Sequence, residues 1–152
     1  MVQVHRFDFG LTRLVDETSA KVCGRICGGH LYAQPLVDLV LSNARDIVAN
    51  RRLRLLGAEA VTADGRECDA CAADAVRFCA IGALIRAAYV LIGDQEQAHR
   101  VGWKVAAIVA KAANLPPVDE DEPGWSLAVL SDRRGQAAVL RAFDALSDEG
   151  RN

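Results

Sequence analysis

The most continuous apolar stretch of the chain lies between residues 72 and 93, and the rest of the sequence is organised around it. Its apolar positions continue around the whole circumference of a helix, and only Asp74, Arg77 and Arg86 interrupt them with charge. A helix that is apolar on nearly every side is surrounded by other elements of the fold. The pattern therefore predicts a buried central helix over residues 72–93, which Gly93 ends.

Amphipathic patterns on either side predict three more helices. Pro35 suits the first turn of one, Asp94 caps the second, and Ser131 or Asp132 caps the last. In each of them apolar residues recur every three or four positions and form one face. These faces consist of Leu36, Val37, Val40, Ala44, Ile47 and Val48, then Ala98, Val101, Val105, Ile108 and Ala112, then Val139, Phe143 and Leu146.

The segments between these patterns read as loops. Residues 57–71 contain an Asp64-Gly65 turn, which allows a small hairpin near residues 58–68. Residues 115–124 contain three prolines and four consecutive acids, so they must leave the helix. We therefore predict an all-α fold class, an irregular or orthogonal bundle of about four or five helices around the central one.

The domain organisation follows from the same patterns. At 152 residues the chain is long enough for one domain with a core of its own. Residues 31–152 are expected to form this single helical domain. Residues 1–30 have the least regular pattern and are interpreted as an N-terminal extension.

Composition narrows the classes of function. Hydrophobic residues make up 51% of the chain and aromatic residues only 5%, which favours helices over sheets. A net charge of -2 argues against a nucleic-acid partner, because binding to phosphates needs a basic face. Arg86 interrupts the apolar run, so no membrane span is expected, and no secretion signal is visible. The protein is expected to be cytoplasmic, with its five cysteines reduced.

Cysteine spacing supplies the strongest chemical candidate. Cys23 and Cys27 form one close pair and Cys68 and Cys71 form another. Two such pairs far apart in sequence commonly supply the four thiolates of a structural zinc site. His30 follows closely enough to replace Cys27 as a ligand. The hypothesis is one structural zinc ion that pins the N-terminal segment to the loop before the central helix, and the alternative is a set of unrelated small side chains.

Two other cysteine chemistries have less support. Cys68 and Cys71 have the spacing of a redox pair, and a helix N-terminus after Cys71 would lower its thiol pKa, but no βαβ pattern surrounds them. A nucleophilic Cys79 would need a histidine base, and every histidine is distant in sequence. We therefore interpret Cys79 as a small buried core residue.

Short motifs along the chain carry a resemblance to a known family. They are Ala63-Asp64-Gly65-Arg66, Ala75-Val76-Arg77-Phe78-Cys79-Ala80, Gly82-Ala83-Leu84, Arg86-Ala87-Ala88, Ser131-Asp132, Val139-Leu140 and Phe143-Asp144. Together they resemble a family of small bacterial and phage-encoded domains of unknown function, over residues 36–146. The family usually has Trp-Asn-Asp where this chain has Leu130-Ser131-Asp132. The resemblance implies a compact helical domain and carries over no catalytic residue.

No local catalytic signature is present: the chain has no phosphate-binding loop, no His-Glu-x-x-His and no Gly-x-Ser-x-Gly. The sequence therefore favours a non-enzymatic interaction or accessory domain, either a homo-oligomer or bound to a protein partner. Trp103 lies off the apolar face of its helix and is a candidate anchor for such an interface. The alternative is an enzyme or small-ligand binder with a pocket between the central helix and the loops at residues 57–71 and 115–124. Polar groups for that pocket would come from Asp64, Arg66, Glu67, Arg77 and Asp132.

Overall fold

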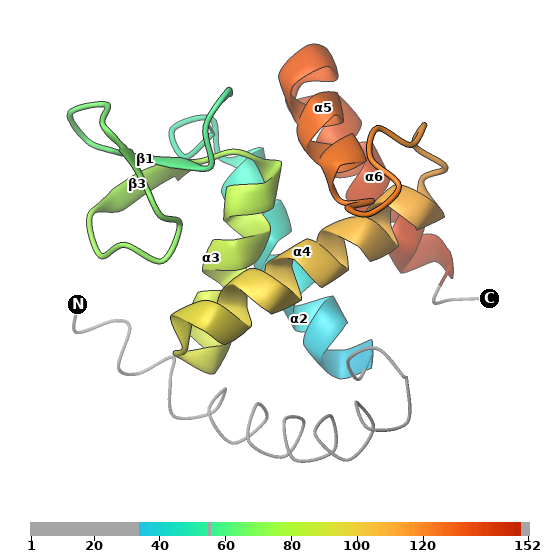
Figure 1. The fold of residues 1–152 in the computed structure, drawn as a ribbon, viewed down its shortest axis with the longest axis horizontal. Coiled ribbons are helices and arrows are strands. Elements are labelled where there is room, and N and C mark those ends of the chain that lie inside the picture. The colour runs from blue at the N-terminus through green and yellow to red at the C-terminus, as the bar shows by residue number, and fades with distance from the viewer. Residues whose placement is uncertain (1–33, 55, 150–152) are drawn as a thin grey trace.

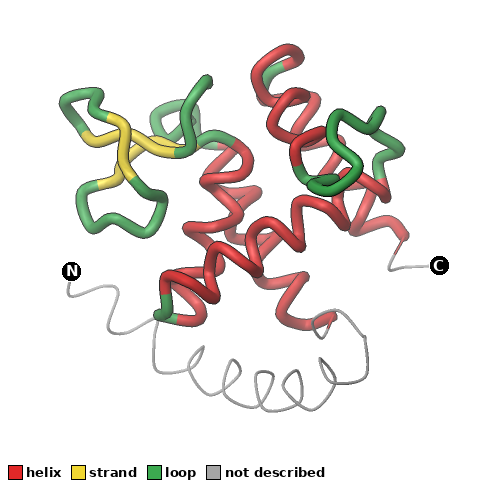
Figure 2. The backbone as a smooth tube through the Cα atoms, viewed as in Figure 1, coloured by secondary structure: helices red, strands yellow, loops and turns green. Residues whose placement is uncertain are grey.

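The computed structural model describes residues 34–54 and 56–149. Within these residues the chain forms five α-helices and three short β-strands (Figures 1 and 2). Their order is α2 (Gln34–Ala49), β1 (Ala60–Thr62), β2 (Glu67–Cys68), β3 (Ala75–Phe78), α3 (Ala80–Ile92), α4 (Gln95–Ala112), α5 (Trp125–Arg134) and α6 (Gln136–Glu149). The predicted extension at residues 1–30 lies outside the described residues.

The helices enclose one hydrophobic core. In Figure 1, α4 crosses in front of α3 and α2, with the strands at one side and α5 and α6 at the other. α3 packs most extensively against α4 and then against α2, while α6 contacts α2, α4 and α5. The core includes the fully buried Leu84 of α3, Val105 of α4 and Phe143 of α6. α3 is therefore the buried central helix that the sequence predicts, although it is shorter than expected.

The predicted all-α fold class is wrong, because the structure contains a small antiparallel sheet. β1 is its middle strand and pairs with β2 on one side and β3 on the other. The hairpin expected near residues 58–68 is confirmed, with Ala60 opposite Cys68 and a left-handed Gly65 (φ 87°) in its turn. β3 was not expected, since residues 75–78 were assigned to the central helix.

The reason for this error is that a short apolar run has no period that separates a buried strand from a helix. Val76 and Phe78 are types that strands favour, and Phe78 also donates its N–H to the carbonyl of Leu53 at 2.7 Å. The helix begins after Cys79, whose Sγ accepts a hydrogen bond from the N–H of Gly82 at 3.3 Å. The strand thus ends where this side-chain cap begins the helix.

The other helix ends follow the expected chemistry in part. Gly93 adopts a left-handed conformation (φ 76°) and ends α3, and Asp94 caps α4 by accepting the N–H of Gln97 at 2.8 Å. The last helix, α6, is confirmed by its buried Val139 and Phe143. Neither Ser131 nor Asp132 caps it, because both residues already belong to α5.

Two glycines allow close approaches around α3. A Cβ on Gly82 would lie 1.9 Å from the carbonyl oxygen of Glu59, in the segment that leads into β1. A Cβ on Gly102 of α4 would lie 2.5 Å from the side chain of Ile85. These positions fix how α3 sits between the sheet and α4. None of the described helices combines the length and apolarity that a membrane span requires.

Candidate functional site

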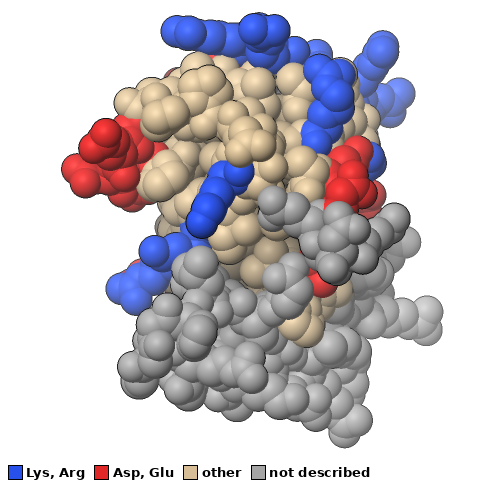
Figure 3. Space-filling view, turned by 90° about the vertical axis from the view of Figure 1, so that its right-hand side faces the viewer, with Lys and Arg blue, Asp and Glu red and all other residues tan. Residues whose placement is uncertain are grey.

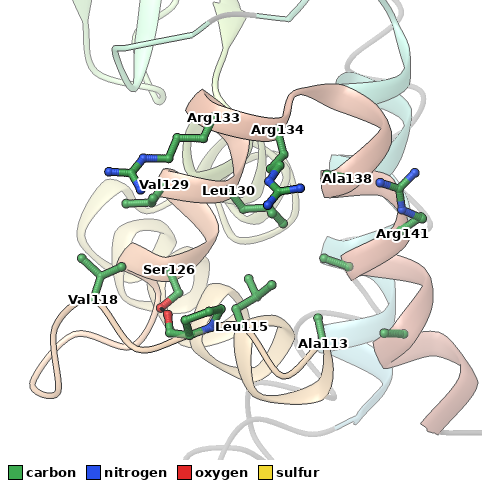
Figure 4. A pocket seen from close by; sticks show the side chains of 13 residues that line it. Ala113, Leu115, Val118, Ser126, Val129, Leu130, Arg133, Arg134, Ala138 and Arg141 are labelled. Atoms are coloured by element: carbon green, nitrogen blue, oxygen red, sulfur yellow. Dashed lines mark hydrogen bonds between the residues drawn. The ribbon is translucent and has the colours of Figure 1, made fainter.

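A pocket lies where the end of α4, the following loop, α5 and α6 meet (Figure 4). Its volume is about 520 Å³, and its floor is mostly apolar. The described residues that line it are Ala113, Leu115, Pro116, Val118, Ser126, Val129, Leu130, Arg133, Arg134, Ala138, Arg141, Ala142 and Ala145. The polar side chains of this lining are Ser126, Arg133, Arg134 and Arg141.

Local sequence builds the wall formed by the loop. Asn114 is left-handed (φ 52°) and turns the chain out of α4, and the two prolines that follow Leu115 prevent the helix from continuing. The hydroxyl of Ser126 then donates to the carbonyl of Pro116 at 2.8 Å, which ties the loop to α5. This bond occupies the one hydroxyl of the lining, so Ser126 has a structural role here.

Trp103 and Trp125 hold the start of α5 against α4. Their ring centroids are 5.3 Å apart with the planes tilted by 53°. Gly124 passes close to Trp103, because a Cβ there would lie 2.9 Å from the indole ring. Trp103 therefore has an intramolecular partner, whereas 45% of Trp125 remains exposed.

Charges of opposite sign border the pocket. Arg133, Arg134 and Arg141 lie at its mouth, and in Figure 4 Arg134 points between α5 and α6 above Leu130. Among the described residues none of these three arginines forms an ion pair. The four exposed acids at residues 119–122 follow Val118 directly. Figure 3 faces this side of the molecule. It shows Lys and Arg along the upper edge and also within the surface, and Asp and Glu in one group at the left edge and another on the right.

The pocket differs from the one expected from sequence. It uses the loop at residues 115–124 as anticipated, but its lining includes no residue of α3 or of the loop at residues 57–71. The described lining also contains no histidine, cysteine or acid that could act as a general base. The arrangement can bind an apolar group beside a negative charge, but it offers no group for proton transfer.

A second group of chemically active side chains lies near the other end of α4. Asp69 and Cys71 belong to the loop between β2 and β3, and His99 lies near the start of α4. One potential ligand atom from each residue lies within 4.8 Å of the other two. Asp69 Oδ2 is 2.8 Å from His99 Nε2, and Asp69 Oδ1 accepts the N–H of Cys71 at 2.7 Å.

Neighbouring groups hold this loop in place. Glu59 Oε1 accepts the N–H of Ala70 at 2.8 Å and lies 4.0 Å from His99 Nε2. Arg86 of α3 donates to the carbonyls of Ala70 and Ala72 at 3.2 and 2.9 Å. The backbone between Asp69 and Ala72 is therefore fixed from both sides by charged side chains.

The electrostatics of the cluster oppose a reactive cysteine. Burial, followed by the hydrogen bond to Asp69 and the charges of Asp69 and Glu59, raises the pKa of Cys71 to about 12. Burial resists ionisation of Asp69 too, but hydrogen bonds from Cys71 and His99 lower its pKa overall. Cys71 therefore stays a thiol at neutral pH, which is the reverse of what a nucleophile or redox cysteine needs. The sequence predicted a helix N-terminus just after Cys71, but the helix begins after Cys79.

Among the described residues, one member of the zinc set proposed from sequence lies in this cluster. Cys71 lies in the cluster with Asp69 and His99, whereas Cys68 is close in the chain but does not belong to it. Cys23, Cys27 and His30 lie outside the described residues. Cys79 is a buried core residue, as interpreted from sequence, and burial raises its thiol pKa.

Sequence reasoning missed Asp69 and His99 as members of a site. Asp69 had a usable signal, because it lies inside the Cys68–Cys71 pair. His99 had none, because it is 30 residues away from Asp69 and meets it only when the loop packs on α4. No family model matches this chain, and no curated protein or solved structure matches it significantly. The family resemblance therefore remains a prediction.

Proposed function

We propose that this protein is a non-enzymatic helical interaction module that forms a homodimer through the face around the pocket. The observation that carries the proposal is an apolar pocket lined by three arginines that form no ion pair among the described residues, beside a run of acids that follows the lining residue Val118. A surface with both signs of charge beside an apolar centre is self-complementary under a two-fold axis. In such a dimer the acids at residues 119–122 of one copy face Arg133 and Arg134 of the other.

Exposed apolar side chains support the same face. Val118 is 57% exposed and Trp125 is 45% exposed, and they lie before and after the acidic run. Large apolar side chains near the centre of a charged rim are typical of interfaces between proteins. Burying them in a dimer removes them from water and brings the opposite charges into a less hydrated environment.

Cytoplasmic localisation is part of the proposal. Cys68, Cys71 and Cys79, the described cysteines, are all free thiols, which fits a reducing compartment.

Charge-swapped variants test the dimer. Arg133→Glu/Arg134→Glu and Asp121→Lys/Glu122→Lys should each be monomeric by light scattering and sedimentation, while the wild type is a dimer. Mixing the two variants should restore a heterodimer, because the swapped charges again face opposite signs. Arg66→Glu/Arg100→Glu, which alters two exposed cations away from the pocket, should remain a dimer.

The wild-type dimer should weaken with added salt, since part of its attraction is between partly hydrated charges. A wild type that is monomeric at the highest concentration reached would overturn self-association. So would two swapped variants that fail to pair when mixed although each is folded.

A second candidate is binding of a small amphipathic anion in the same pocket. Its volume of about 520 Å³ is in the usual range for ligand sites, and Arg134 points over the apolar floor. A screen of medium-chain carboxylates should then raise the melting temperature of the wild type, and Arg134→Ala should remove this shift. No shift with any chain length would reject this candidate and leave the dimer untouched.

A further inference from the structure

We propose that Asp69, Cys71 and His99 bind a divalent transition-metal ion of the zinc class. The site is separate from the pocket: His99 and Ala113 are 14 residues apart along α4 and just beyond it, which is roughly 20 Å at 1.5 Å per residue. The proposal does not depend on dimerisation.

The geometry of the three side chains is close to that of a coordination shell. Their ligand atoms lie within 4.8 Å of one another, and the Asp69–His99 pair is 2.8 Å apart. With metal–ligand bonds of about 2.0–2.3 Å in a tetrahedron, ligand atoms lie roughly 3.3–3.7 Å from one another. The side chains therefore need shifts of roughly 1 Å or less, which changes of rotamer in a loop residue and a helix residue can supply.

The donor types select the metal. A thiolate, an imidazole and a carboxylate together are borderline-soft ligands, which Zn²⁺ and Co²⁺ accept and which Mg²⁺ and Ca²⁺ do not prefer. The loop also holds Asp69 and Cys71 two residues apart in an already fixed backbone, because Glu59 and Arg86 bond to the intervening segment. Such preorganisation reduces the entropy lost when a metal binds.

The surroundings favour a cation. Glu59 Oε1 lies 4.0 Å from His99 Nε2, which places a carboxylate just outside the ligand set. Arg86 donates its hydrogen bonds to the loop carbonyls rather than to the carboxylates of Asp69 or Glu59. Two carboxylates, those of Asp69 and Glu59, therefore lie within 4.0 Å of His99 and would attract a cation.

Access is sufficient for exchange with solvent. The side chains of His99 and Asp69 are 29% and 36% exposed, while Cys71 is buried. Three protein ligands leave a fourth position on the exposed side for water or another ligand. This set differs from the four-cysteine hypothesis, because it uses His99 and does not require Cys23 or Cys27.

Cobalt titration of the full-length, untagged, metal-free and reduced chain tests the site. Co²⁺ should bind one ion per chain with a thiolate-to-metal absorption band in the near ultraviolet, and Zn²⁺ should displace it. Cys71→Ser should remove the thiolate band. His99→Ala and Asp69→Ala should each weaken Zn²⁺ binding at least about tenfold, since changes even outside the ligand set cost that much.

Matched variants separate the proposal from its rivals. Cys79→Ser changes a buried cysteine outside the cluster, and Asp74→Asn changes an exposed acid in the same loop; both should bind Co²⁺ and Zn²⁺ as the wild type does. Cys23→Ser/Cys27→Ser should also retain binding. Circular dichroism checks that each variant is folded. If Cys71→Ser does not fold, His99→Ala serves as the decisive variant.

Three results would overturn the proposal: no stoichiometric Co²⁺ or Zn²⁺ binding, a thiolate band that survives in folded Cys71→Ser, or unchanged Zn²⁺ affinity in His99→Ala. Loss of binding in Cys23→Ser/Cys27→Ser together with normal binding in His99→Ala would establish the four-cysteine site instead.

Discussion

At the residue scale, the motifs behind the family resemblance hold turns and caps. Asp64 accepts hydrogen bonds from the hydroxyl of Thr62 and from Arg66 Nε at the tip of the hairpin, and these bonds, the one from Thr62 first, lower its pKa. Asp132 of α5 accepts the N–H of Gly57 at 3.0 Å and so ties the loop before β1 to α5. These residues have structural roles in the fold, so the motif by itself indicates a fold and no reaction.

Replacing Cys79 by serine separates two effects of this residue: its capping of α3 and its contribution to the pH dependence of stability. Burial raises the thiol pKa of Cys79 above its ordinary value of 9.0. The folded state therefore favours the neutral thiol of Cys79. The stability that this group contributes is fully present below its unfolded-state pKa and is lost as pH rises through its folded-state pKa. Serine keeps the cap and has no such titration. As pH rises from about 8 to about 10, the free energy of unfolding of the wild type should therefore fall relative to that of Cys79→Ser.

Urea denaturation across this pH range measures the difference. Near pH 7 the two proteins should differ by about 1 kcal/mol or less, as expected for exchange of one capping side chain for another. A difference that stays constant with pH would contradict the buried, neutral thiol.

Gly82 gives a second prediction at this scale. Alanine is normally the better helix former by about 1 kcal/mol. At this position its Cβ would meet the carbonyl oxygen of Glu59 at 1.9 Å, so helix α3 or the segment before β1 must move. Gly82→Ala should destabilise the protein by about 1–3 kcal/mol in urea denaturation. A stabilised variant would contradict a close contact between Gly82 and Glu59.

At the element scale, the end of α2 depends on α6. Gln136 Nε2 donates to the carbonyls of Val48 and Ala49, each at 2.8 Å, and its Oε1 accepts from Arg54 at 3.3 Å. The last carbonyls of a helix have no partner within it, so a side chain from another helix supplies one here. This contact joins the first described helix to the last.

Replacement of Gln136 tests this cap. Gln136→Leu should lower the free energy of unfolding by about 1–3 kcal/mol, because the partly buried carbonyl of Val48 and the exposed one of Ala49 lose their donor. Gln97→Leu, an exposed glutamine in the first turn of α4, should change it by less than about 0.5 kcal/mol. Equal effects of the two substitutions in urea denaturation would argue against a specific cap.

The same scale shows how far the sequence predicts the fold. α2, α4 and α6 were predicted because each carries a wide apolar face. Pro35 and Asp94 also marked the starts of α2 and α4, whereas the start expected for α6 lies inside α5. α5 was missed because Ser126 and Ser131 occupy buried positions and hide its apolar period. β3 was missed because its four residues resemble the helix that follows them. Of the cluster, Cys71 was anticipated, and Asp69 had a signal in its place between Cys68 and Cys71. His99 could not be anticipated, because it meets Asp69 only through tertiary packing.

At the scale of the whole molecule, α4 connects the Asp69–Cys71–His99 cluster to the pocket. Its start carries His99 of the metal cluster, and its end leads into the wall of the pocket. Both places rest on one core, which runs through all five described helices. Core continuity of this kind predicts that the two ends of the molecule unfold together.

Two native reporters make this prediction measurable. Both tryptophans of the chain lie at the contact of α4 with α5, so fluorescence reports the pocket end. Cys79 is buried at the start of α3, so its labelling by a thiol reagent, located by peptide mass spectrometry, reports the sheet end. In urea the two transitions should share one midpoint. Zn²⁺ bound to the folded cluster should raise both midpoints equally, because a ligand that binds only the folded state stabilises the whole cooperative unit. A fluorescence transition at lower urea, unmoved by Zn²⁺, would show instead that α5 and α6 unfold as a separate unit and that the core does not couple the pocket to the cluster.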